Sequence, residues 1–331
     1  MASSSPNPVP DAATLSAKYT ALIASKTILV TGVSPTSIGS AFVQALASAS
    51  PSLIILAGRN ASKLSETAAT VTDAHPSARV RTLQLDLSCL DAVRRSAEEV
   101  LSWHDVPAVD VLVNNAGVMA TDFALSPQGT ESQFAANHLA HFLFTNLIMP
   151  KVLKAKSPRI VMVASDGHRL SPIRWDDLNF DSGKTYDKWR AYGQSKTANM
   201  LFALSLSRKL ATRGLQAYSV HPGVILGTGL AAHLDGSASG DFALLTELDK
   251  AQGNAEGWKG FDAISREQGA ATLMYAALDP ALGEEHNGGY LVPCRVADAF
   301  RDTVRPWAVS PFEAERLWDL SEKLVGNKFS Y

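Results

Sequence analysis

Short apolar runs recur along this sequence, separated by longer stretches with a different pattern. Seven runs are strand candidates, at residues 27–31, 53–57, 80–85, 109–113, 159–164, 216–220 and 290–292. Most of the stretches between them place apolar residues three and four apart, which is typical of amphipathic helices. Near-continuous apolar strands that alternate with such helices indicate a parallel sheet covered on both faces. The sequence therefore predicts an α/β fold with a doubly wound parallel sheet of about seven strands.

One large domain accounts for most of the chain. The 331 residues are 46% hydrophobic, which is enough for a full core, but the chain is short for two domains. We expect a tail and a short helix over residues 1–25, the sheet domain over 26–299, and a C-terminal extension over 300–331 whose helix packs on that domain. Residues 227–265 interrupt the alternation, and we interpret them as a loop-and-helix insertion that forms a lid.

The charge balance argues against several classes of partner. Thirty basic residues nearly cancel 32 acidic ones, and no basic run exceeds two residues, so nothing indicates binding to nucleic acid or anionic membrane. No stretch of about 18 apolar residues predicts a membrane span. Cys89 and Cys294 belong to no metal or disulfide pattern and fit a reducing compartment. We therefore expect a cytoplasmic protein with a small-molecule partner.

Three histidines invite a metal or substrate hypothesis. His138 and His141 lie three residues apart without an acid or cysteine cluster nearby. We interpret both as packing side chains and expect no metal site. His168 is close in sequence to Ser165, yet packing is also the favoured interpretation for it.

Small and polar residues follow the strand candidates. Ligands of a doubly wound sheet bind beyond the carboxyl ends of its strands, so these residues are candidates for function. In chain order they are the stretch TGVSPTSIG, then Arg59, Asp86 with Leu87, the stretch NNAG, Ser165, and Pro222 with Gly223. This set supplies backbone donors for phosphates and polar groups for ribose and base. The sequence therefore predicts a dinucleotide along this edge.

The stretch TGVSPTSIG, residues 31–39, leads from the first strand into a helix. Amides at the start of a helix bind phosphate because they are unsatisfied and aligned with the helix dipole. Gly32 and Gly39 allow a positive φ or a close approach, and Ser34 offers a hydroxyl. We expect the pyrophosphate to be held by Ser34 and the amides near Ile38 and Gly39.

The end of the second strand bears on the choice of dinucleotide. An acidic residue there would bind the adenosine 2′-hydroxyl and repel a 2′-phosphate. The sequence has Gly58-Arg59-Asn60, with one guanidinium and no acid. This pattern favours NADP over NAD.

Tyr192 and Lys196 lie four residues apart, which places them on one face of a helix. Transfer of a hydride to a carbonyl leaves an alkoxide that must receive a proton, and a phenol is a candidate donor. A neighbouring ammonium lowers the pKa of a phenol, so we expect Lys196 to lower that of Tyr192 while it binds the nicotinamide ribose. Ser165, at the end of the fifth strand, would then hold the carbonyl oxygen.

Taken in order, the set TG…IG, Asp86, NNAG, Ser165, YxxxK and PG resembles the short-chain dehydrogenase/reductase superfamily over nearly the whole chain. The segments 137–142, 165–169, 192–202 and 315–324 are similar to its branch of retinol dehydrogenases and WW-domain oxidoreductases, which has many fungal members. The resemblance implies a Rossmann-type fold, a nicotinamide cofactor, and a protein that works as a monomer or homodimer.

Roles follow from the resemblance by matching position. It implies that Tyr192 is the general acid or base, that Lys196 assists it, and that Ser165 orients the carbonyl. It also implies that Asn137 holds a water linking Lys196 to a proton relay. The residues expected at the cofactor, from the sequence and from the resemblance together, are Gly32, Ser34, Ile38, Gly39, Arg59, Asp86, Leu87, Asn115, Ala116, Gly117, Tyr192, Lys196, Pro222, Gly223, Val224 and Thr228.

The chain departs from the family pattern at three places. Its glycine loop is one residue longer than TGxxxGxG and has Ser37 where a central glycine is usual. The interval from Ser165 to Tyr192 is long and contains residues 175–179, which we interpret as a wall of the substrate pocket. The sequence Leu226-Gly227-Thr228 also makes the threonine a less certain match.

These observations favour an NADP(H)-dependent oxidoreductase that interconverts a ketone or aldehyde and an alcohol. We expect carbonyl reduction of a hydrophobic molecule, such as a specialised metabolite. Two alternatives stay open. One is a lyase or isomerase on the same fold that uses Tyr192 without net redox change. The other is a sensor that binds the cofactor without turnover, although such a protein need not keep Ser165, Tyr192 and Lys196.

Overall fold

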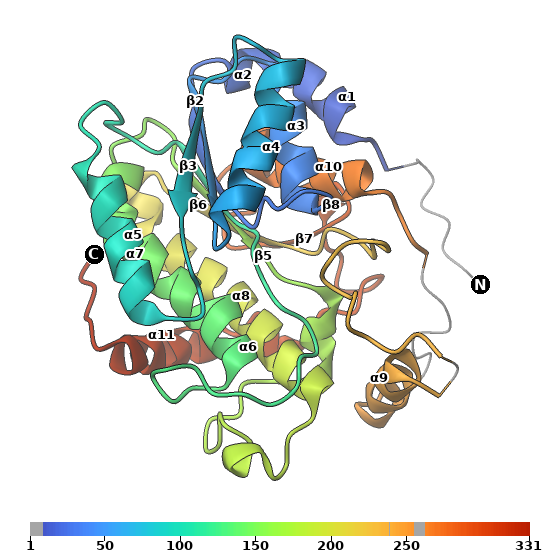
Figure 1. Cartoon of the computed structure of the whole chain (residues 1–331). Helices are drawn as coiled ribbons and strands as arrows, with labels where there is room; N and C mark the ends of the chain where they lie inside the picture. Colours follow the sequence, from blue (N-terminus) through green and yellow to red (C-terminus); the bar gives the residue numbers. More distant parts are fainter. Residues whose placement is uncertain (1–8, 238, 255–261) are drawn as a thin grey trace.

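The computed structural model describes residues 9–237, 239–254 and 262–331 (Figure 1). Within these ranges the chain forms one eight-stranded sheet in the order β3-β2-β1-β4-β5-β6-β7-β8. Neighbouring strands are parallel, except that β8 runs antiparallel to β7. The strands are β1 (Thr27–Thr31), β2 (Leu53–Gly58), β3 (Val80–Gln84), β4 (Val111–Asn114), β5 (Arg159–Val163), β6 (Gln216–Val220), β7 (Tyr290–Val292) and β8 (Arg295–Val296). The predicted doubly wound parallel sheet is confirmed.

All seven predicted strands are present, with ends that differ by at most two residues. The sequence missed β8, which is only two residues long and follows a tight turn in which Cys294 has a φ of 54°. A strand this short has no alternation to detect. The correction is therefore one additional antiparallel edge strand.

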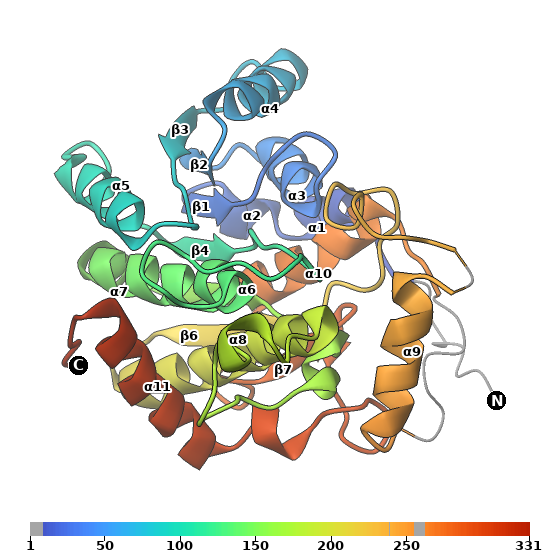
Figure 2. The same cartoon turned by 60° about the horizontal axis from the view of Figure 1, so that its bottom comes forward.

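Helices cover both faces of the sheet (Figures 1 and 2). On one face lie α1 (Ala12–Lys18), α3 (Ile38–Ala47), α4 (Ala61–Ala74) and α10 (Arg266–Leu278). On the other lie α5 (Leu90–Ser102), α7 (Ala140–Val152), α8 (Lys188–Leu210) and α11 (Pro311–Val325). Three further helices are α2 (Thr20–Ile23), α6 (Ser132–Phe134) and α9 (Asp241–Ala251). Figure 2 shows α9 beside this layered body rather than in either layer.

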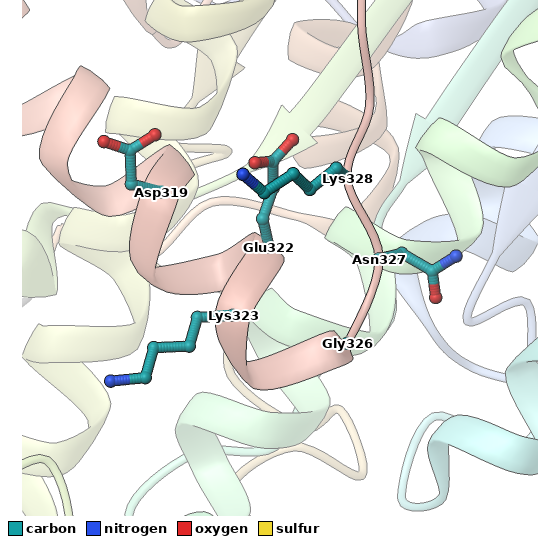
Figure 3. Close-up of a pocket in the computed structure, with 6 residues that line it drawn as sticks. All are labelled: Asp319, Glu322, Lys323, Gly326, Asn327 and Lys328. Carbon is teal, nitrogen blue, oxygen red and sulfur yellow. The ribbon is translucent and has the colours of Figure 1, made fainter.

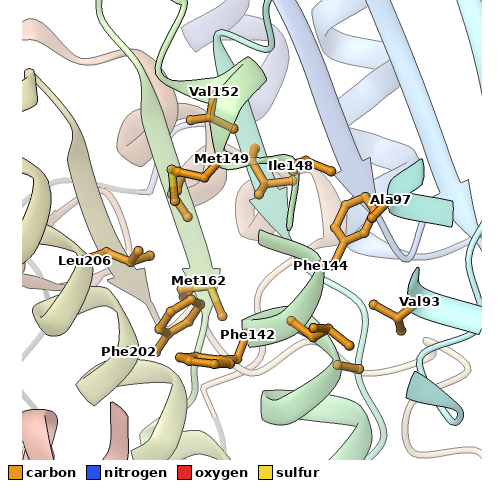
Figure 4. Packing of buried hydrophobic residues seen from close by; sticks show 14 of the residues in the cluster. Val93, Ala97, Phe142, Phe144, Ile148, Met149, Val152, Met162, Phe202 and Leu206 are labelled. Carbon is orange, nitrogen blue, oxygen red and sulfur yellow. The ribbon is translucent and has the colours of Figure 1, made fainter. Parts of the chain in front are cut away.

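The core between the sheet and α5, α7 and α8 is rich in large apolar side chains (Figure 4). Phe142 and Phe202 are almost completely buried, with their ring centroids 5.1 Å apart. Trp318 of α11 meets Phe142 edge to face at 5.0 Å. Each such side chain contributes about 1.5–3 kcal/mol when it leaves water. The helix of the C-terminal extension therefore belongs to this core.

The order of the strands determines where a ligand can enter. Connections run from β1 to β2 and β3 on one side and resume at β4 on the other, so the direction of winding reverses between β1 and β4. The crevice at the carboxyl ends of these two strands is where such sheets bind ligands. Within the described ranges, no helix is long and apolar enough to cross a membrane.

Candidate active site

The glycine loop follows β1, and its two glycines are required by geometry. Gly32 has a φ of +75°, and a Cβ there would lie 2.6 Å from the Cα of Ala116. A Cβ on Gly39 would lie 2.5 Å from the carbonyl oxygen of Gly32. Real Cβ atoms do not tolerate such distances from backbone, so the loop and its neighbour are tightly apposed. Both positions fit the close approach of a ligand to backbone.

Ser37 replaces the expected glycine as the N-cap of α3. Its hydroxyl accepts from the amide of Ser40 at 3.0 Å and donates to the carbonyl of Gly32 at 3.1 Å. The left-handed conformation in this part of the loop falls on Thr36, with a φ of 65°. Among the described residues, the next two amides of α3, those of Ile38 and Gly39, have no hydrogen-bond partner. Such amides at the start of a helix are able to bind an anion, and the predicted contact with a phosphate remains a proposal.

Asn115 connects the glycine loop to β4. Its side-chain amide donates to the carbonyls of Thr31 and Gly32, each at 2.9 Å. The hydroxyl of Thr31 accepts from the amides of Asn115 and Ala116, both at 3.0 Å. That hydroxyl therefore donates its proton to Nε2 of His141, 3.1 Å away. The predicted cofactor residues at the ends of β1 and β4 thus form one connected unit.

Arg59 and Asp86 stand at the ends of β2 and β3. Within the part of the chain that the structure describes, the exposed guanidinium of Arg59 makes no hydrogen bond or ion pair, so it is available to an anion. Asp86 accepts from the amide and hydroxyl of Ser88, at 3.0 and 2.7 Å. Leu87 is partly buried against the core below α5. The end of β2 therefore carries an exposed cation, and its contact with a 2′-phosphate remains a proposal.

Ser165, Tyr192 and Lys196 come together where β5 meets α8. Nζ of Lys196 donates to the carbonyl of Val163 at 3.0 Å and lies 5.5 Å from the centroid of the Tyr192 ring. A Cβ on Gly167 would lie 2.8 Å from Cε1 of Tyr192 and 3.3 Å from Oγ of Ser165. The tyrosine ring and the serine hydroxyl are therefore immediate neighbours.

Burial controls the ionisation of this group. Burial raises the pKa of Tyr192 to about 12, although a hydrogen bond with the Ser165 side chain acts to lower it. Burial also lowers the pKa of Lys196 to about 8. We expected Lys196 to lower the pKa of Tyr192, but this lowering is not found in the protein chain without cofactor. Burial of the phenol has the larger effect and raises its pKa. At pH 7 the phenol is protonated and able to donate.

Asn137 lies in a π-helical turn, Ala135–Leu139, between α6 and α7. Its Oδ1 accepts from the amide of Val118 at 2.8 Å. Its Nδ2 donates to the carbonyl of Val118 and to Oγ of Ser195, each at 2.9 Å. A Cβ on Gly117 would lie 3.0 Å from Oδ1 of Asn137 and 3.5 Å from Nζ of Lys196. The side chain thus fixes the segment after β4 beside Lys196, and its predicted contact with water remains a proposal.

The segment after β6 contains the remaining predicted residues. Gly223 has a φ of +100°, and a Cβ there would lie 2.4 Å from Cδ1 of Ile264. Val224 forms a parallel bridge with Ala263, so this segment pairs with the end of the insertion. Among the described residues Thr228 makes no hydrogen bond, and its cofactor contact remains a proposal.

Apolar side chains surround the tyrosine on the insertion side. Tyr192 clusters with Trp189, and helix α9 adds Leu245 and Leu248. The remaining members of the cluster are Ala120 and Leu170, with Met119, Leu234 and Phe242 packed around it. The indole of Trp189 donates to the carbonyl of Asp241 at 2.9 Å, which fixes the start of α9. The reacting groups therefore adjoin an apolar wall.

The three histidines are buried and hydrogen-bonded to protein. His168 accepts from the amide of Arg305 through Nε2, so its proton is on Nδ1, which donates to the carbonyl of Ser165 at 2.9 Å. His141 bridges Thr31 and the carbonyl of Asn137, and His138 contacts Ser321. Within the described ranges, no group of three or more candidate metal ligands is found.

Acid should destabilise the protein through these histidines. Burial lowers their pKa values from 6.5 to about 3 for His138 and about 4 for His141 and His168. Since the unfolded chain then binds more protons, stability is full above pH 6.5 and falls as the pH drops towards 4, by about 1.4 kcal/mol per pH unit for each histidine. Urea unfolding between pH 8 and 5 measures this slope. Stability that stays constant down to pH 5 would contradict the prediction.

A hollow of about 580 Å³ lies elsewhere, at the end of α11. It is lined by Asp319, Glu322, Lys323, Gly326, Asn327 and Lys328, and Figure 3 shows that the side chains of Lys323 and Asn327 point in different directions. Glu322 is engaged in bonds from the Trp318 indole and the Phe329 amide. None of the predicted site residues lines this hollow, so the convergent polar groups at Tyr192 identify the candidate site instead.

Several site residues were not predicted from the sequence. Ser195 accepts a hydrogen bond from Asn137 and directly precedes Lys196 in the chain. Its position between Tyr192 and Lys196 could therefore have marked it as a site residue. Trp189 lies one helical turn before Tyr192, so the same helical spacing could have identified it. Arg169 pairs with Asp249, and Arg305 contacts the backbone of Gln252. No local pattern marks these two contacts, because each joins segments distant in sequence.

Comparison with known proteins adds an independent finding. The family model described as short chain dehydrogenase matches residues 26–176. Short-chain dehydrogenase TIC 32 A, chloroplastic, from Brassica napus is 38% identical over 282 residues, which cover 82% of this chain and 80% of that protein. Retinol dehydrogenase 12 from Mus musculus is 32% identical over 306 residues, covering 92% and 87%. A crystal structure of an uncharacterized protein from Mycobacterium paratuberculosis matches with a TM-score of 0.67 and 31% identity, covering 94% and 98%.

Proposed function

Because the chain belongs to the short-chain dehydrogenase/reductase family, in its retinol dehydrogenase-like branch, we propose that it is an NADP(H)-dependent oxidoreductase. Its reaction interconverts a ketone or aldehyde and an alcohol on a hydrophobic small molecule. The observation that supports this most directly is the meeting of Ser165, Tyr192 and Lys196 beside an apolar wall. We propose carbonyl reduction in specialised metabolism as the physiological direction.

Each side chain of the site has a distinct task in this reaction. When bound, the reduced nicotinamide supplies a hydride to the carbonyl carbon. The hydroxyl of Ser165 orients the carbonyl oxygen, and Tyr192 gives that oxygen its phenolic proton. The ammonium of Lys196 stabilises the phenolate that remains until the phenol is protonated again from water. A phenol with a raised pKa is fully loaded with its proton at pH 7, which suits the direction of reduction.

The glycine loop and Arg59 support NADP as the cofactor. Two amides at the start of α3, which have no hydrogen-bond partner in the described part of the chain, and the exposed hydroxyl of Ser34 fit a pyrophosphate. The Arg59 guanidinium after β2, which makes no hydrogen bond or ion pair among the described residues and has no acid beside it in the sequence, fits a 2′-phosphate. The residues present therefore fit NADP, and Asp86, Asn115 and Gly117 would line the remainder of the cofactor.

The apolar cluster at Tyr192 supports a hydrophobic substrate. Trp189, Leu245 and Leu248 offer no charged group to a ligand, so a polar substrate would lose hydration without compensation. Residues 227–265 would act as the lid that covers it. Residues 238 and 255–261 of this predicted insertion lie outside the described residues.

A panel of hydrophobic ketones and aldehydes with NADPH tests the proposal. Absorbance of the reduced nicotinamide is followed together with product. We expect consumption of NADPH equal to the alcohol formed. Product formed without consumption of NADPH would indicate a lyase or isomerase instead. Binding of NADPH without any product would indicate a cofactor sensor.

The compartment and the oligomeric state are part of the same proposal. Cys89 and Cys294 are free thiols, which fits the reducing cytoplasm. One relative is chloroplastic by name, so fractionation of cells is the direct measurement. We propose a monomer or homodimer, to be checked by light scattering.

A further inference from the structure

Three segments that are far apart in sequence meet beside the reacting groups. They are the 3-10 turn after Ser165 (Asp166–Leu170), the end of α9, and the C-terminal extension around Arg305. Arg169 and Asp249 form the central contact, with Nε to Oδ1 at 2.7 Å. Their side chains are 9% and 0% exposed. A buried ion pair of this kind fixes one arrangement of the two segments, because separation of the partners would leave a charge without compensation.

Further hydrogen bonds extend this contact to the C-terminal extension. Nδ2 of Asn254 donates to Oδ1 of Asp249 at 2.5 Å. The guanidinium of Arg305 donates to Oδ1 of Asn254 and to the carbonyl of Gln252, the latter at 2.9 Å. Each of these bonds is to a group just after or within α9. The C-terminal end of the lid helix is therefore attached to Arg305.

The C-terminal extension also contacts the 3-10 turn that follows Ser165. The backbone amide of Arg305 donates to Nε2 of His168 at 3.3 Å, and the indole of Trp307 donates to the carbonyl of His168 at 3.2 Å. His168 donates to the carbonyl of Ser165. Since His168 adjoins Arg169, the bonds close a ring, which we call the lid ring: Arg169, Asp249, Asn254, Arg305 and His168.

Apolar packing alone is a modest anchor for α9. Its buried residues are Asp241, Leu245, Leu248 and Asp249, and Leu244 is 53% exposed. The start of α9 is fixed through Asp241, which pairs with Lys188 and accepts from Trp189. The lid ring is the corresponding attachment at the other end. Elements with few buried apolar contacts open locally at low cost, so a second attachment at this end would restrain the local opening of α9.

We propose that Arg169 and Arg305 are positioning residues that hold α9 over Tyr192, so that the C-terminal extension sets how large a substrate the site accepts. The placement of α9 is supported by the hydrogen bonds and the ion pair of the lid ring. The effect on substrates rests on the proposed oxidoreductase function.

Hydrogen exchange of the full-length protein tests the placement without any reaction. In Arg305→Met and Arg169→Met, we expect amides of residues 241–251 to exchange about tenfold faster, since charge-assisted bonds are lost, while α8 keeps its wild-type rates. Lys250→Met, an exposed change on α9 itself, is the matched control and should exchange as wild type. Asn254→Ala is the milder variant should Arg169→Met fail to fold, because it opens the ring and leaves Arg169 paired with Asp249. Unchanged exchange at 241–251, or equal acceleration in α8, would overturn the proposal.

Steady-state kinetics test the second part. If the lid ring sets substrate size, KM for a bulky carbonyl should change by about tenfold in Arg305→Met, while KM for a small carbonyl and the dissociation constant of NADPH change by less than about twofold. Equal changes for both substrates would overturn the effect on specificity. A wild-type protein without carbonyl reductase activity but with the expected exchange pattern would reject the proposed function alone.

Discussion

Tyr192→Phe should lower kcat for carbonyl reduction by about 10²–10⁴-fold, the range that a positioned proton donor contributes. The phenylalanine ring keeps the contacts with Trp189 and with the apolar wall, and only the phenolic proton is lost. Binding of NADPH, followed by quenching of protein fluorescence, should stay close to wild type because no phosphate contact is altered. Single-turnover kinetics then separate the loss of chemistry from the loss of binding.

A matched control comes from a second buried tyrosine near the site. Tyr290 packs edge to face on His168 at 5.2 Å, and within the described ranges its hydroxyl has no hydrogen-bond partner. Tyr290→Phe removes an equivalent group from a similar environment and should leave kcat within about threefold of wild type. If Tyr192→Phe kept most of its activity, another proton donor would have to be sought.

Arg59→Ala should weaken NADPH by about 10–100-fold, which corresponds to the loss of hydrogen bonds from a charged donor. NADH, which has no 2′-phosphate, should be affected by less than about threefold. The guanidinium makes no other hydrogen bond or ion pair among the described residues, so its removal should not disturb the fold. Titration calorimetry with both cofactors gives the two dissociation constants directly.

The control for this change is Arg79→Ala. Arg79 is an exposed arginine at the amino end of β3, whereas Arg59 follows the carboxyl end of β2. It alters the net charge equally and should leave both affinities unchanged. Raising the salt concentration should reduce the NADPH effect of Arg59→Ala, because exposed charges are screened. Equal weakening of NADPH and NADH would reject the contact between Arg59 and the 2′-phosphate.

The sequence predicted those parts of the molecule that depend on local pattern. β1 was placed to the residue because its five-residue, β-branched apolar run has the length of a strand and is too short for a typical helix. The positions of the glycine loop, Asn115 and Ser165 followed from the rule that strand ends share one edge. Tyr192 and Lys196 were found because four residues make about one helical turn.

Properties that depend on distant contacts were outside the reach of the sequence. Arg169 and Asp249 are 80 residues apart, and nothing around either one indicates a partner. The pKa of Tyr192 was expected to fall near Lys196, but burial by side chains from α9 and from Trp189 raises it. The role of Ser37 was also missed, since a serine N-cap requires knowledge of where α3 begins.

The position of α11 has a consequence for how the protein is made. This helix packs on α8, with Trp318 against Phe202 at 6.0 Å and the Ser205 hydroxyl bonded to the carbonyl of Ala314 at 2.9 Å. The helix that presents Tyr192 is therefore synthesised more than 100 residues before its cover, and its apolar face stays exposed on the ribosome until residue 325 has emerged. Products that stop before α11 would contain every reacting side chain but would leave this apolar surface uncovered, and uncovered apolar surface promotes aggregation.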